Sequence, residues 1–327
     1  MPISTVQKFP HSRVLLPRTR LAYIHLRNLL SDAKRDRGAR VAGYVAIWLP
    51  EEMIVLYMHG GELINATVCD GKGSRAVSIA HALERVPAAP EYGEICFCSA
   101  EAEQLDCMYV AQTTAAVTFP EKLAVTDPVT LFPYLGATTF DGLLEIVTGD
   151  AVHYVVFVNG MVSRSYLAGT PVASAYQAND DVGRLFANGR PGELKVRRWN
   201  DIPELGVQAP PALVQAYKDL ATGLVGTLVA GGRASAPAIA EHARQALLEA
   251  HPVLDGITLG DRPARGDIVA DSDTLTSGVA AWVREVVWTA VDHDSIAPEQ
   301  LLRDLTWERR HLFQSAGLYE QIPWKVL

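Results

Sequence analysis

The stretch Gly43–Cys69, GYVAIWLPEEMIVLYMHGGELINATVC, predicts the fold because the chain repeats its pattern once. Displaced by 99 positions, Gly142–Ala168 reads GLLEIVTGDAVHYVVFVNGMVSRSYLA and aligns with the first stretch without a gap. The same displacement places Gly93-Glu94-Ile95 on Gly192-Glu193-Leu194. Two matches at one displacement predict an internal duplication.

Each copy predicts a β-meander, in which three short strands are joined by tight turns. In the first copy, Tyr44–Leu49 and Met53–Met58 have the length of strands and are rich in β-branched and aromatic residues. Gly60-Gly61 and, in the second copy, Asn159-Gly160 predict the next hairpin turn, because both central positions of such a turn can require a positive φ.

Helices are expected around each meander, because a meander must bury one face. The expected helices are Leu21–Lys34, Ser74–Arg85 and Asp127–Leu135. Asp127-Pro128 is a typical helix start, with Asp as the cap and Pro at the first helical position. Two further strands, Gly93–Cys98 and Leu105–Val110, are expected to close the first sheet, and residues 170–190 are expected to hold a shortened second helix of the second copy.

The C-terminal part predicts helices, because its apolar period changes to 3.6 residues from Leu213 onward. The expected helical segments are Leu213–Leu228, Ile239–Ala250, Leu275–Ala290 and Pro298–Ala316, the last one stopped by Gly317. The predicted fold class is therefore α+β, with two duplicated β-meander-plus-helix units followed by an α-helical C-terminal domain. The expected domains are a basic N-terminal arm (1–20), the first unit (21–117), the second unit (118–202) and the helical domain (203–327).

The composition is that of a globular protein: 49% of the 327 residues are hydrophobic and 20% are charged. The net charge of −8 disfavours nucleic acid as a partner. No stretch has the length of a transmembrane helix, and the N-terminus lacks the apolar core of a signal peptide. Four cysteines are too few for a disulfide scaffold in a chain of this length, so a cytoplasmic, reducing environment is expected.

The charge is unevenly distributed. Residues 1–40 contain nine Lys or Arg and two Asp, a net charge of +7, whereas the remaining residues carry 20 basic and 35 acidic groups, a net charge of −15. Such an arm either docks on an anionic surface, such as an acidic partner or the cytoplasmic side of a membrane complex, or folds back on its own acidic body. Residues 1–20 contain three prolines and are expected to be irregular.

The predicted helix Leu275–Ala290 is apolar on more than one side and must be covered. Its tryptophans, and the one that follows in the next helix, are expected either in the core or at a contact with a partner. The residues expected at interaction surfaces are Lys8, Arg13, Arg18, Arg20, Arg27, Trp282, Trp288 and Trp307.

Motifs that carry chemistry are scarce. The sequence contains no G-x-S-x-G, H-E-x-x-H, Walker A or G-x-G-x-x-G pattern. Gly71-Lys72-Gly73-Ser74 resembles part of a phosphate loop, but it lacks the upstream glycine, so an ordinary turn is expected. Cys96 and Cys98 share one face of a strand and Cys107 could join them, yet a zinc site usually has four ligands, so buried core cysteines are expected. We therefore expect no cofactor, no metal and no enzymatic activity.

The order of helix, glycine-led strands, glycine turn and glycine-containing loop resembles the PATAN domain. Bacteria attach this domain to response regulators and other signalling proteins, normally as one copy. The residues that carry the resemblance are Leu29-Leu30, Gly43-Tyr44-Val45, Val55–Met58, Gly61-Glu62-Leu63, Ala66 and Gly93-Glu94-Ile95, and in the second copy Leu131-Phe132, Gly142-Leu143-Leu144, Val155–Phe157, Gly160 and Gly192-Glu193-Leu194. The resemblance covers about 60% of the chain and implies a module for protein–protein contact.

These observations predict a cytoplasmic bacterial scaffold or adaptor in signalling, or a peripheral subunit of an assembly. Its expected partners are one or more proteins in a membrane-bound complex, together with contact to an anionic membrane surface. The expected location is the cytoplasm, at the periphery of the inner membrane. The alternative hypothesis is a small-ligand sensor with a cleft between the two repeated units.

Overall fold

The computed structural model describes residues 7–35, 41–87, 91–169, 182–187, 194–257, 267–290 and 297–326. The chain divides into two compact units. Unit 1 comprises Met1–Ala76 and Ala82–Leu205, and unit 2 comprises Val77–His81 and Gly206–Leu327. The boundary falls inside the Pro203–Pro211 stretch, where the sequence changes from strand-like to helical patterns.

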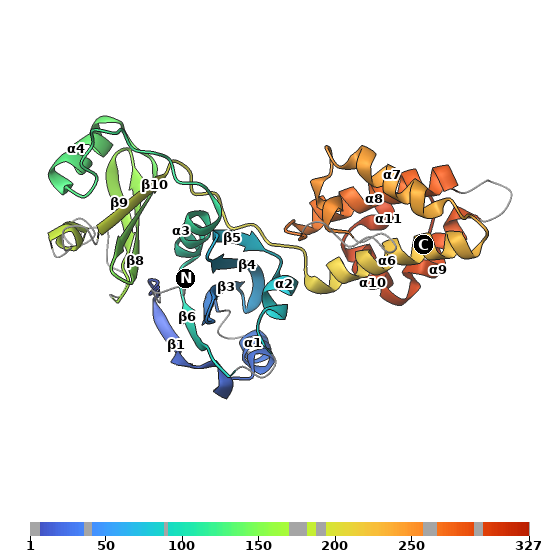
Figure 1. The fold of residues 1–327 in the computed structure, drawn as a ribbon, viewed down its shortest axis with the longest axis horizontal. Coiled ribbons are helices and arrows are strands. Elements are labelled where there is room, and N and C mark those ends of the chain that lie inside the picture. The colour runs from blue at the N-terminus through green and yellow to red at the C-terminus, as the bar shows by residue number, and fades with distance from the viewer. Residues whose placement is uncertain are drawn as a thin grey trace. The chain divides into compact units, whose positions relative to one another are not determined.

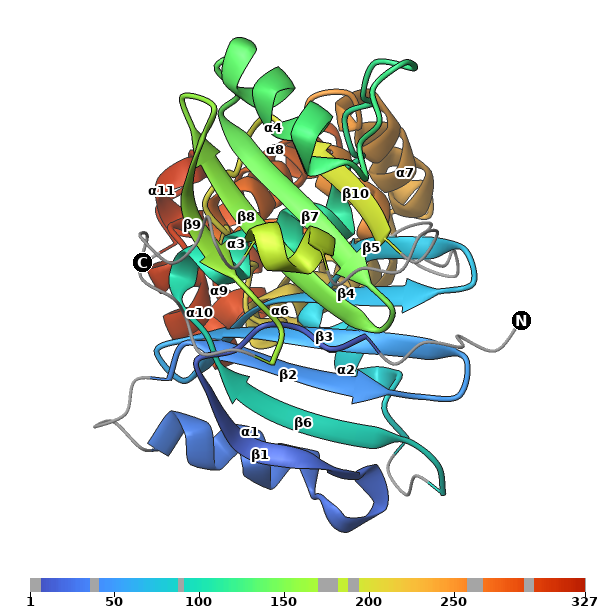
Figure 2. The ribbon, with the colours of Figure 1, turned by 90° about the vertical axis from the view of Figure 1, so that its left-hand side faces the viewer.

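Unit 1 is mixed α and β and contains two sheets (Figure 1). Sheet 1 has the order β1-β6-β2-β3-β4-β5, and sheet 2 has the order β10-β7-β8-β9 (Figure 2). The strands of sheet 1 are β1 (Arg13–Arg20), β2 (Gly43–Trp48), β3 (Glu52–His59), β4 (Glu62–Asp70), β5 (Gly73–Val77) and β6 (Glu94–Ser99). Those of sheet 2 are β7 (Gly142–Thr148), β8 (Ala151–Val158), β9 (Met161–Tyr166) and β10 (Leu194–Trp199).

The two meanders have the same strand order and the same register. Gly43 pairs with Met58, and Gly142 pairs with Phe157, which is the same pairing displaced by 99 positions. The irregularity between Tyr57 and Met58 in β3 recurs between Val156 and Phe157 in β8. The predicted three-stranded meanders are therefore present. In addition, both have an irregularity at the matching position.

The last strand of each set departs from the predicted alignment. Ile95 of β6 pairs with Ile47, whereas it is Val196 of β10 that pairs with Ile146. The structural displacement is thus two residues larger than the 99 expected for Leu194, and the predicted match of Ile95 with Leu194 is wrong. A shift of two leaves every side chain on its original face of the sheet, so the hydrophobic pattern does not reveal it.

The repeated glycines occupy positions that exclude a side chain. A Cβ on Gly43 would lie 2.1 Å from the carbonyl oxygen of Cys98, and one on Gly142 would lie 2.1 Å from that of Trp199. The hairpin glycines lie against the helix that precedes their meander. A Cβ on Gly61 would approach the carbonyl oxygen of Ala33 in α1 (Leu26–Arg35), and one on Gly160 that of Leu135 in α4 (Pro128–Ala137), to 2.5 and 2.7 Å respectively.

Helix α3 (Ala102–Thr113) lies against both sheets, in contact with β2, β4 and β8. The prediction of a strand at Leu105–Val110 is wrong. Because both sheets cover this helix, it is buried on most sides and lacks the one-sided apolar stripe that identifies a surface helix. The core around it is formed by Phe9, Tyr44, Ala46, Met53, Val55, Tyr57, Ile64, Cys96, Cys98, Ala100, Leu105, Cys107, Met108, Val110, Ala111, Leu143, Val152, Tyr154, Val156, Tyr166 and Trp199.

The opposite face of sheet 2 is covered by α4 and by the helical residues 182–187. Asp127 caps α4 as predicted, accepting a hydrogen bond of 3.0 Å from the Val129 backbone, with Pro128 at the first helical position. The predicted second helix of this copy is present at residues 182–187, and the rest of the stretch 170–190 lies outside the described residues.

Two other local predictions are corrected. The N-terminal segment is not irregular throughout, because Arg13–Arg20 forms the edge strand β1, paired with β6. Pro17 is compatible with an edge position, since an edge strand has backbone N–H groups that need no partner within the sheet. The stretch predicted as the helix Ser74–Arg85 begins with β5 and becomes helical only in α2 (Ile79–Glu84).

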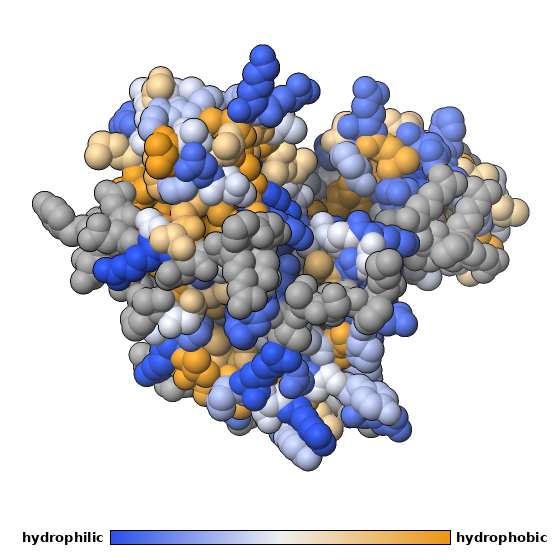
Figure 3. Space-filling model, turned by 60° about the vertical axis from the view of Figure 1, so that its left-hand side comes forward, coloured by the Kyte–Doolittle hydropathy of each residue, from blue (hydrophilic) through white to orange (hydrophobic). Residues whose placement is uncertain are grey.

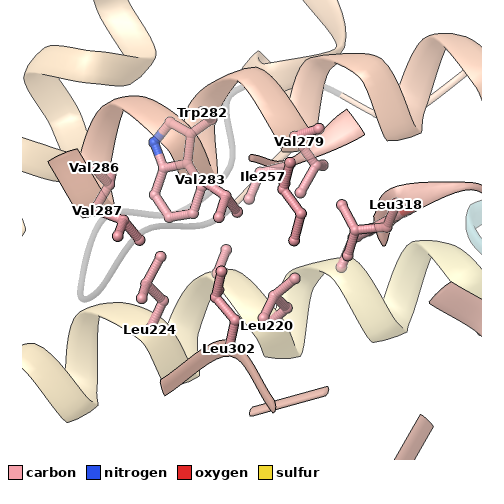
Figure 4. Close-up of a cluster of buried hydrophobic side chains, with 14 of the residues drawn as sticks. Leu220, Leu224, Ile257, Val279, Trp282, Val283, Val286, Val287, Leu302 and Leu318 are labelled. Atoms are coloured by element: carbon pink, nitrogen blue, oxygen red, sulfur yellow. The ribbon is translucent and has the colours of Figure 1, made fainter. Parts of the chain in front are cut away.

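Unit 2 contains the predicted helical C-terminal region. Its helices are α6 (Pro211–Ala230), α7 (Ala236–Leu247), α8 (Ser272–Ala290), α9 (Pro298–Thr306), α10 (Arg310–Ser315) and α11 (Leu318–Gln321). The helix predicted at Pro298–Ala316 is interrupted by the 3₁₀ turn Trp307–Arg309, and Gly317 ends it in the left-handed conformation expected of a stop. Trp282 of α8 lies among aliphatic side chains of α6, α8, α9 and α11 (Figure 4).

Candidate interaction surface

The five basic residues predicted for docking have different surroundings. Lys8 Nζ lies 2.7 Å from Asp150 Oδ2, and Arg18 is bonded to Glu94 with its guanidinium 5.0 Å from the centre of the Trp48 ring. The contacts of these two residues agree with the alternative in which the basic arm folds back on the acidic body of the protein. The other three, Arg13, Arg20 and Arg27, are exposed and have no acidic partner within the described part of the chain.

The residues next to Lys8 bind the N-terminal segment into unit 1. The Lys8 backbone exchanges hydrogen bonds of 2.7 and 2.9 Å with Asp150 and Val152 at the start of β8. The Phe9 side chain is 5% exposed and meets the Tyr44 ring edge-on. We call Lys8–Pro10 the N-terminal strap, because it continues from sheet 2 toward β1 of sheet 1.

Side chains from both α3 and β2 hold the strap. The hydroxyl of Tyr44 donates a hydrogen bond of 3.0 Å to the carbonyl oxygen of Pro10, and Gln104 Nε2 donates to the same oxygen at 2.5 Å. Removing the strap would leave two buried donors unpaired, which is destabilising. The segment predicted as a docking arm is thus, from Lys8 onward, a structural part of unit 1.

An apolar groove of about 550 Å³ lies between the segment that follows β1 and helix α2. It is lined by Leu21, Ile24, His25, Leu26, Arg27, Leu30, Leu83, Glu84, Val86 and Pro87, all of which belong to unit 1. We call it the α1–α2 groove. Most of its lining is aliphatic, and the exposed Arg27 stands on its rim. Sequence patterns did not indicate the groove, because Leu26 and Leu30 read as ordinary members of a core-facing helical stripe.

The corresponding gap over sheet 2 is closed by aromatic side chains. The rings of Phe132, from α4, and Phe186, from the helical residues 182–187, meet edge to face with centroids 5.6 Å apart. Phe132 also stacks on Phe157 of β8, at 6.4 Å. Among the described residues, phenylalanines thus pack together over sheet 2, whereas leucines border a groove over sheet 1.

The upper part of unit 1, where α4 lies, also carries exposed apolar residues (Figure 3). Val129 of α4 is 77% exposed, and Val158 and Met161 at the β8–β9 turn are exposed as well. Helix α4 contains no charged residue. Val158 and Met161 pair across this turn, and none of the three residues lines a groove among those described.

The tryptophans predicted for unit 2 divide into core and surface. Trp282 is buried, and its indole N–H donates a hydrogen bond of 2.9 Å to the carbonyl oxygen of Ala240. Trp288 is 61% exposed, with its ring edge-on to that of Trp324 at 5.9 Å, and Trp307 is 64% exposed. Trp282 is thus a core residue, and Trp288 and Trp307 are available to a partner.

Two buried ionisable groups of sheet 2, Glu145 and His153, have partners within the fold. Burial raises the pKa of Glu145, and an ion pair of 2.6 Å with Arg197 opposes this shift. Burial lowers the pKa of His153 to about 4. The His153 ring accepts a hydrogen bond from the Ala168 backbone at Nδ1, so its proton resides on Nε2, 3.0 Å from the hydroxyl of Thr148. These contacts indicate a neutral structural histidine.

The cysteines and the glycine-rich turn have structural surroundings as well. Cys96, Cys98 and Cys107 are buried free thiols, and burial raises the pKa of Cys107. Across the described residues, no group of three or more His, Cys, Asp or Glu has the arrangement of a metal site. At the β4–β5 turn, Asp70 accepts hydrogen bonds from the Lys72 backbone and from Arg75, so this carboxylate already occupies the donors that a phosphate would need.

Comparison of the chain with protein-family models, curated proteins and solved structures gave no match. None of the helices in the described ranges is long and apolar enough to span a membrane.

Proposed function

We propose that this protein is a non-enzymatic adaptor that binds a partner protein through the α1–α2 groove of unit 1. The observation that carries the proposal is the groove itself, an aliphatic channel of about 550 Å³ on the surface with an exposed arginine at its rim. Apolar surface of this kind is disfavoured in water and is typical of sites where proteins bind one another. Unit 2 would contribute a second surface through Trp288 and Trp307.

We further propose that the two meanders of unit 1 are duplicated PATAN-type modules. The equal strand order, the equal register of the first three strands and the paired glycines support this proposal. In a PATAN-type protein these modules serve contacts between proteins, which agrees with the adaptor proposal. The corresponding place of action is the cytoplasm, as a peripheral subunit of a bacterial assembly.

The adaptor proposal accounts for unit 1 better than a small-ligand sensor does. A sensor of the predicted kind needs a cleft between the two repeated units. That space is occupied by α3 and by the side chains of both sheets, with Tyr57, Tyr154 and Cys107 fully buried there. The open apolar space lies instead on the outer side of sheet 1, where a protein segment has access.

The test is affinity purification of the tagged full chain from its native cells, compared with the variant Leu83→Glu, which places a charge in the groove. A matched control is Val129→Glu, an equally drastic change at an exposed site on α4. We expect a defined partner to co-purify with the wild type and with Val129→Glu, and to be lost with Leu83→Glu. Equal recovery of that partner by all three folded proteins would refute the groove as the binding site.

A further inference from the structure

We infer that the α1–α2 groove receives an aromatic side chain from an acidic segment of the partner protein. The inference rests on the proposed function of the groove and adds the chemistry of its occupant. It follows from a comparison of the helices that cover the two sheets of unit 1. Over sheet 2, phenylalanine side chains of the chain itself take the place that the groove leaves open over sheet 1.

The hairpin glycines define which residues of α1 and α4 correspond. Gly61 lies against Ala33 and Gly160 lies against Leu135. Leu30 in α1 and Phe132 in α4 each precede the contact residue by three positions. They therefore lie nearly one turn away on the same side of their helices. Leu30 lines the groove, and Phe132 fills the corresponding gap over sheet 2.

The second helix of each set gives the same result. Helix α2 follows the first meander, and the helical residues 182–187 follow the second. Leu83 of α2 lines the groove together with Leu30, and the ring of Phe186 meets that of Phe132. Both positions that hold a phenylalanine over sheet 2 thus hold a leucine over sheet 1, and the space of the missing rings is open.

An aromatic side chain from a partner would fill that space as Phe132 and Phe186 do. Aromatic side chains bury about 150–250 Å² each and dominate the energetics of many interfaces. The groove volume of about 550 Å³ lies within the usual range of about 300–1,000 Å³ for binding pockets. It therefore has room for one or two large side chains of a bound segment.

The positive charge of Arg27 at the rim of the groove indicates that the bound segment is acidic. Arg27 stands three residues before Leu30 and is exposed, whereas Val129 occupies the same place relative to Phe132. The open groove thus has a cation where the closed one has a neutral residue. Of the lining residues, Glu84 is the single acid. Arg27 has no acidic partner in the described ranges, so an Asp or Glu of a partner can pair with it.

The experiment fills the groove from within. In the full-length variant Leu30→Phe/Leu83→Phe, the helices over sheet 1 carry a pair of phenylalanines like the pair over sheet 2. A phage-displayed library of random peptides, selected on the wild type, serves as the probe. We expect the enriched peptides to combine an aromatic residue with neighbouring Asp or Glu. Their binding should be lost with Leu30→Phe/Leu83→Phe, weakened about tenfold by Arg27→Glu, and unchanged by the control Val129→Glu.

Three results would overturn the inference. Enriched peptides that bind the filled variant as well as the wild type would show that they bind elsewhere, and a selection without groove-dependent peptides would show that no such segment is recognised. Groove-dependent peptides without aromatic or acidic residues would leave the adaptor function in place and refute the chemistry proposed here. Anionic phosphatidylserine vesicles that sediment the wild type but not the filled variant would indicate a membrane surface in place of a peptide.

Discussion

Phe132 and Phe186 meet edge to face, with their ring centroids 5.6 Å apart, on the face of sheet 2 that α4 covers. Phe186 is buried in the hydrophobic cluster beneath α4, where Phe132 packs against it. This contact links a helix that precedes the meander with one that follows it. The contribution of this contact to stability can be compared with that of Leu30 and Leu83, which lie over sheet 1.

We predict that Phe132→Leu/Phe186→Leu lowers the free energy of unfolding by about 2–4 kcal/mol, because both apolar area and an aromatic contact are lost. The reciprocal variant Leu30→Phe/Leu83→Phe should be neutral or stabilising, since its rings enter an open groove. Urea denaturation followed by circular dichroism measures both effects. Similar destabilisation by both variants would contradict the proposed difference between the packed phenylalanines over sheet 2 and the open groove over sheet 1.

We predict that Gly43→Ala lowers the free energy of unfolding by about 3 kcal/mol or more, since the new Cβ would lie 2.1 Å from the backbone of β6. Gly136→Ala is the matched control. Gly136 lies in α4 with no atom within 4 Å of the new Cβ, so this change should stabilise the protein by about 0.5 kcal/mol. Thermal unfolding of the two variants tests the pair, and equal melting temperatures would refute the close approach.

We predict that Phe9→Ala destabilises unit 1 by about 3–5 kcal/mol, because its buried ring leaves a cavity beside Tyr44. Lys8→Ala removes only an exposed ion pair and should change stability by less than about 1 kcal/mol. Chemical denaturation distinguishes the two. If both substitutions proved harmless, the N-terminal strap would be an accessory rather than a part of the core.

We predict a pH-dependent loss of stability that depends on His153. Its pKa in the folded protein is about 4, below the usual value of 6.5, so the unfolded chain binds a proton first as the pH falls. Stability should therefore be retained above about pH 6.5 and decline by about 3 kcal/mol between pH 6.5 and 4. His153→Gln should remove this part of the pH dependence, which unfolding curves at several pH values would detect. A wild-type and variant difference that stays constant with pH would contradict the buried neutral ring.

Local patterns predicted the meanders, β6 and α4 closely but missed α3 and β1. Met53–Met58 was predicted and β3 spans Glu52–His59, because strand and turn preferences are local. Helix α3 was missed because its burial by two sheets removes the amphipathic pattern. Strand β1 was missed because its pairing with β6 depends on residues far away in the sequence.

The surfaces were predictable only in part. Arg13, Arg20 and Arg27 are exposed, as a basic segment suggests, but whether Lys8 and Arg18 find acidic partners depends on the tertiary fold. The α1–α2 groove depends on a difference of size between leucine and phenylalanine at positions that are equally apolar in sequence. Hydrophobic patterning does not register that difference, whereas packing does.

The N-terminal strap also affects how the chain folds during its synthesis. Lys8 leaves the ribosome early, yet its partner Ala151 at the start of β8 is translated much later. Phe9 and β1 can meet Tyr44 and β6 earlier, but Lys8 must remain without its final contacts until β8 has been made. Pairings this distant in sequence form slowly, and the waiting segment is open to chaperones or to a second nascent chain. Slow codons placed after β8 would give the strap time to close before unit 2 emerges.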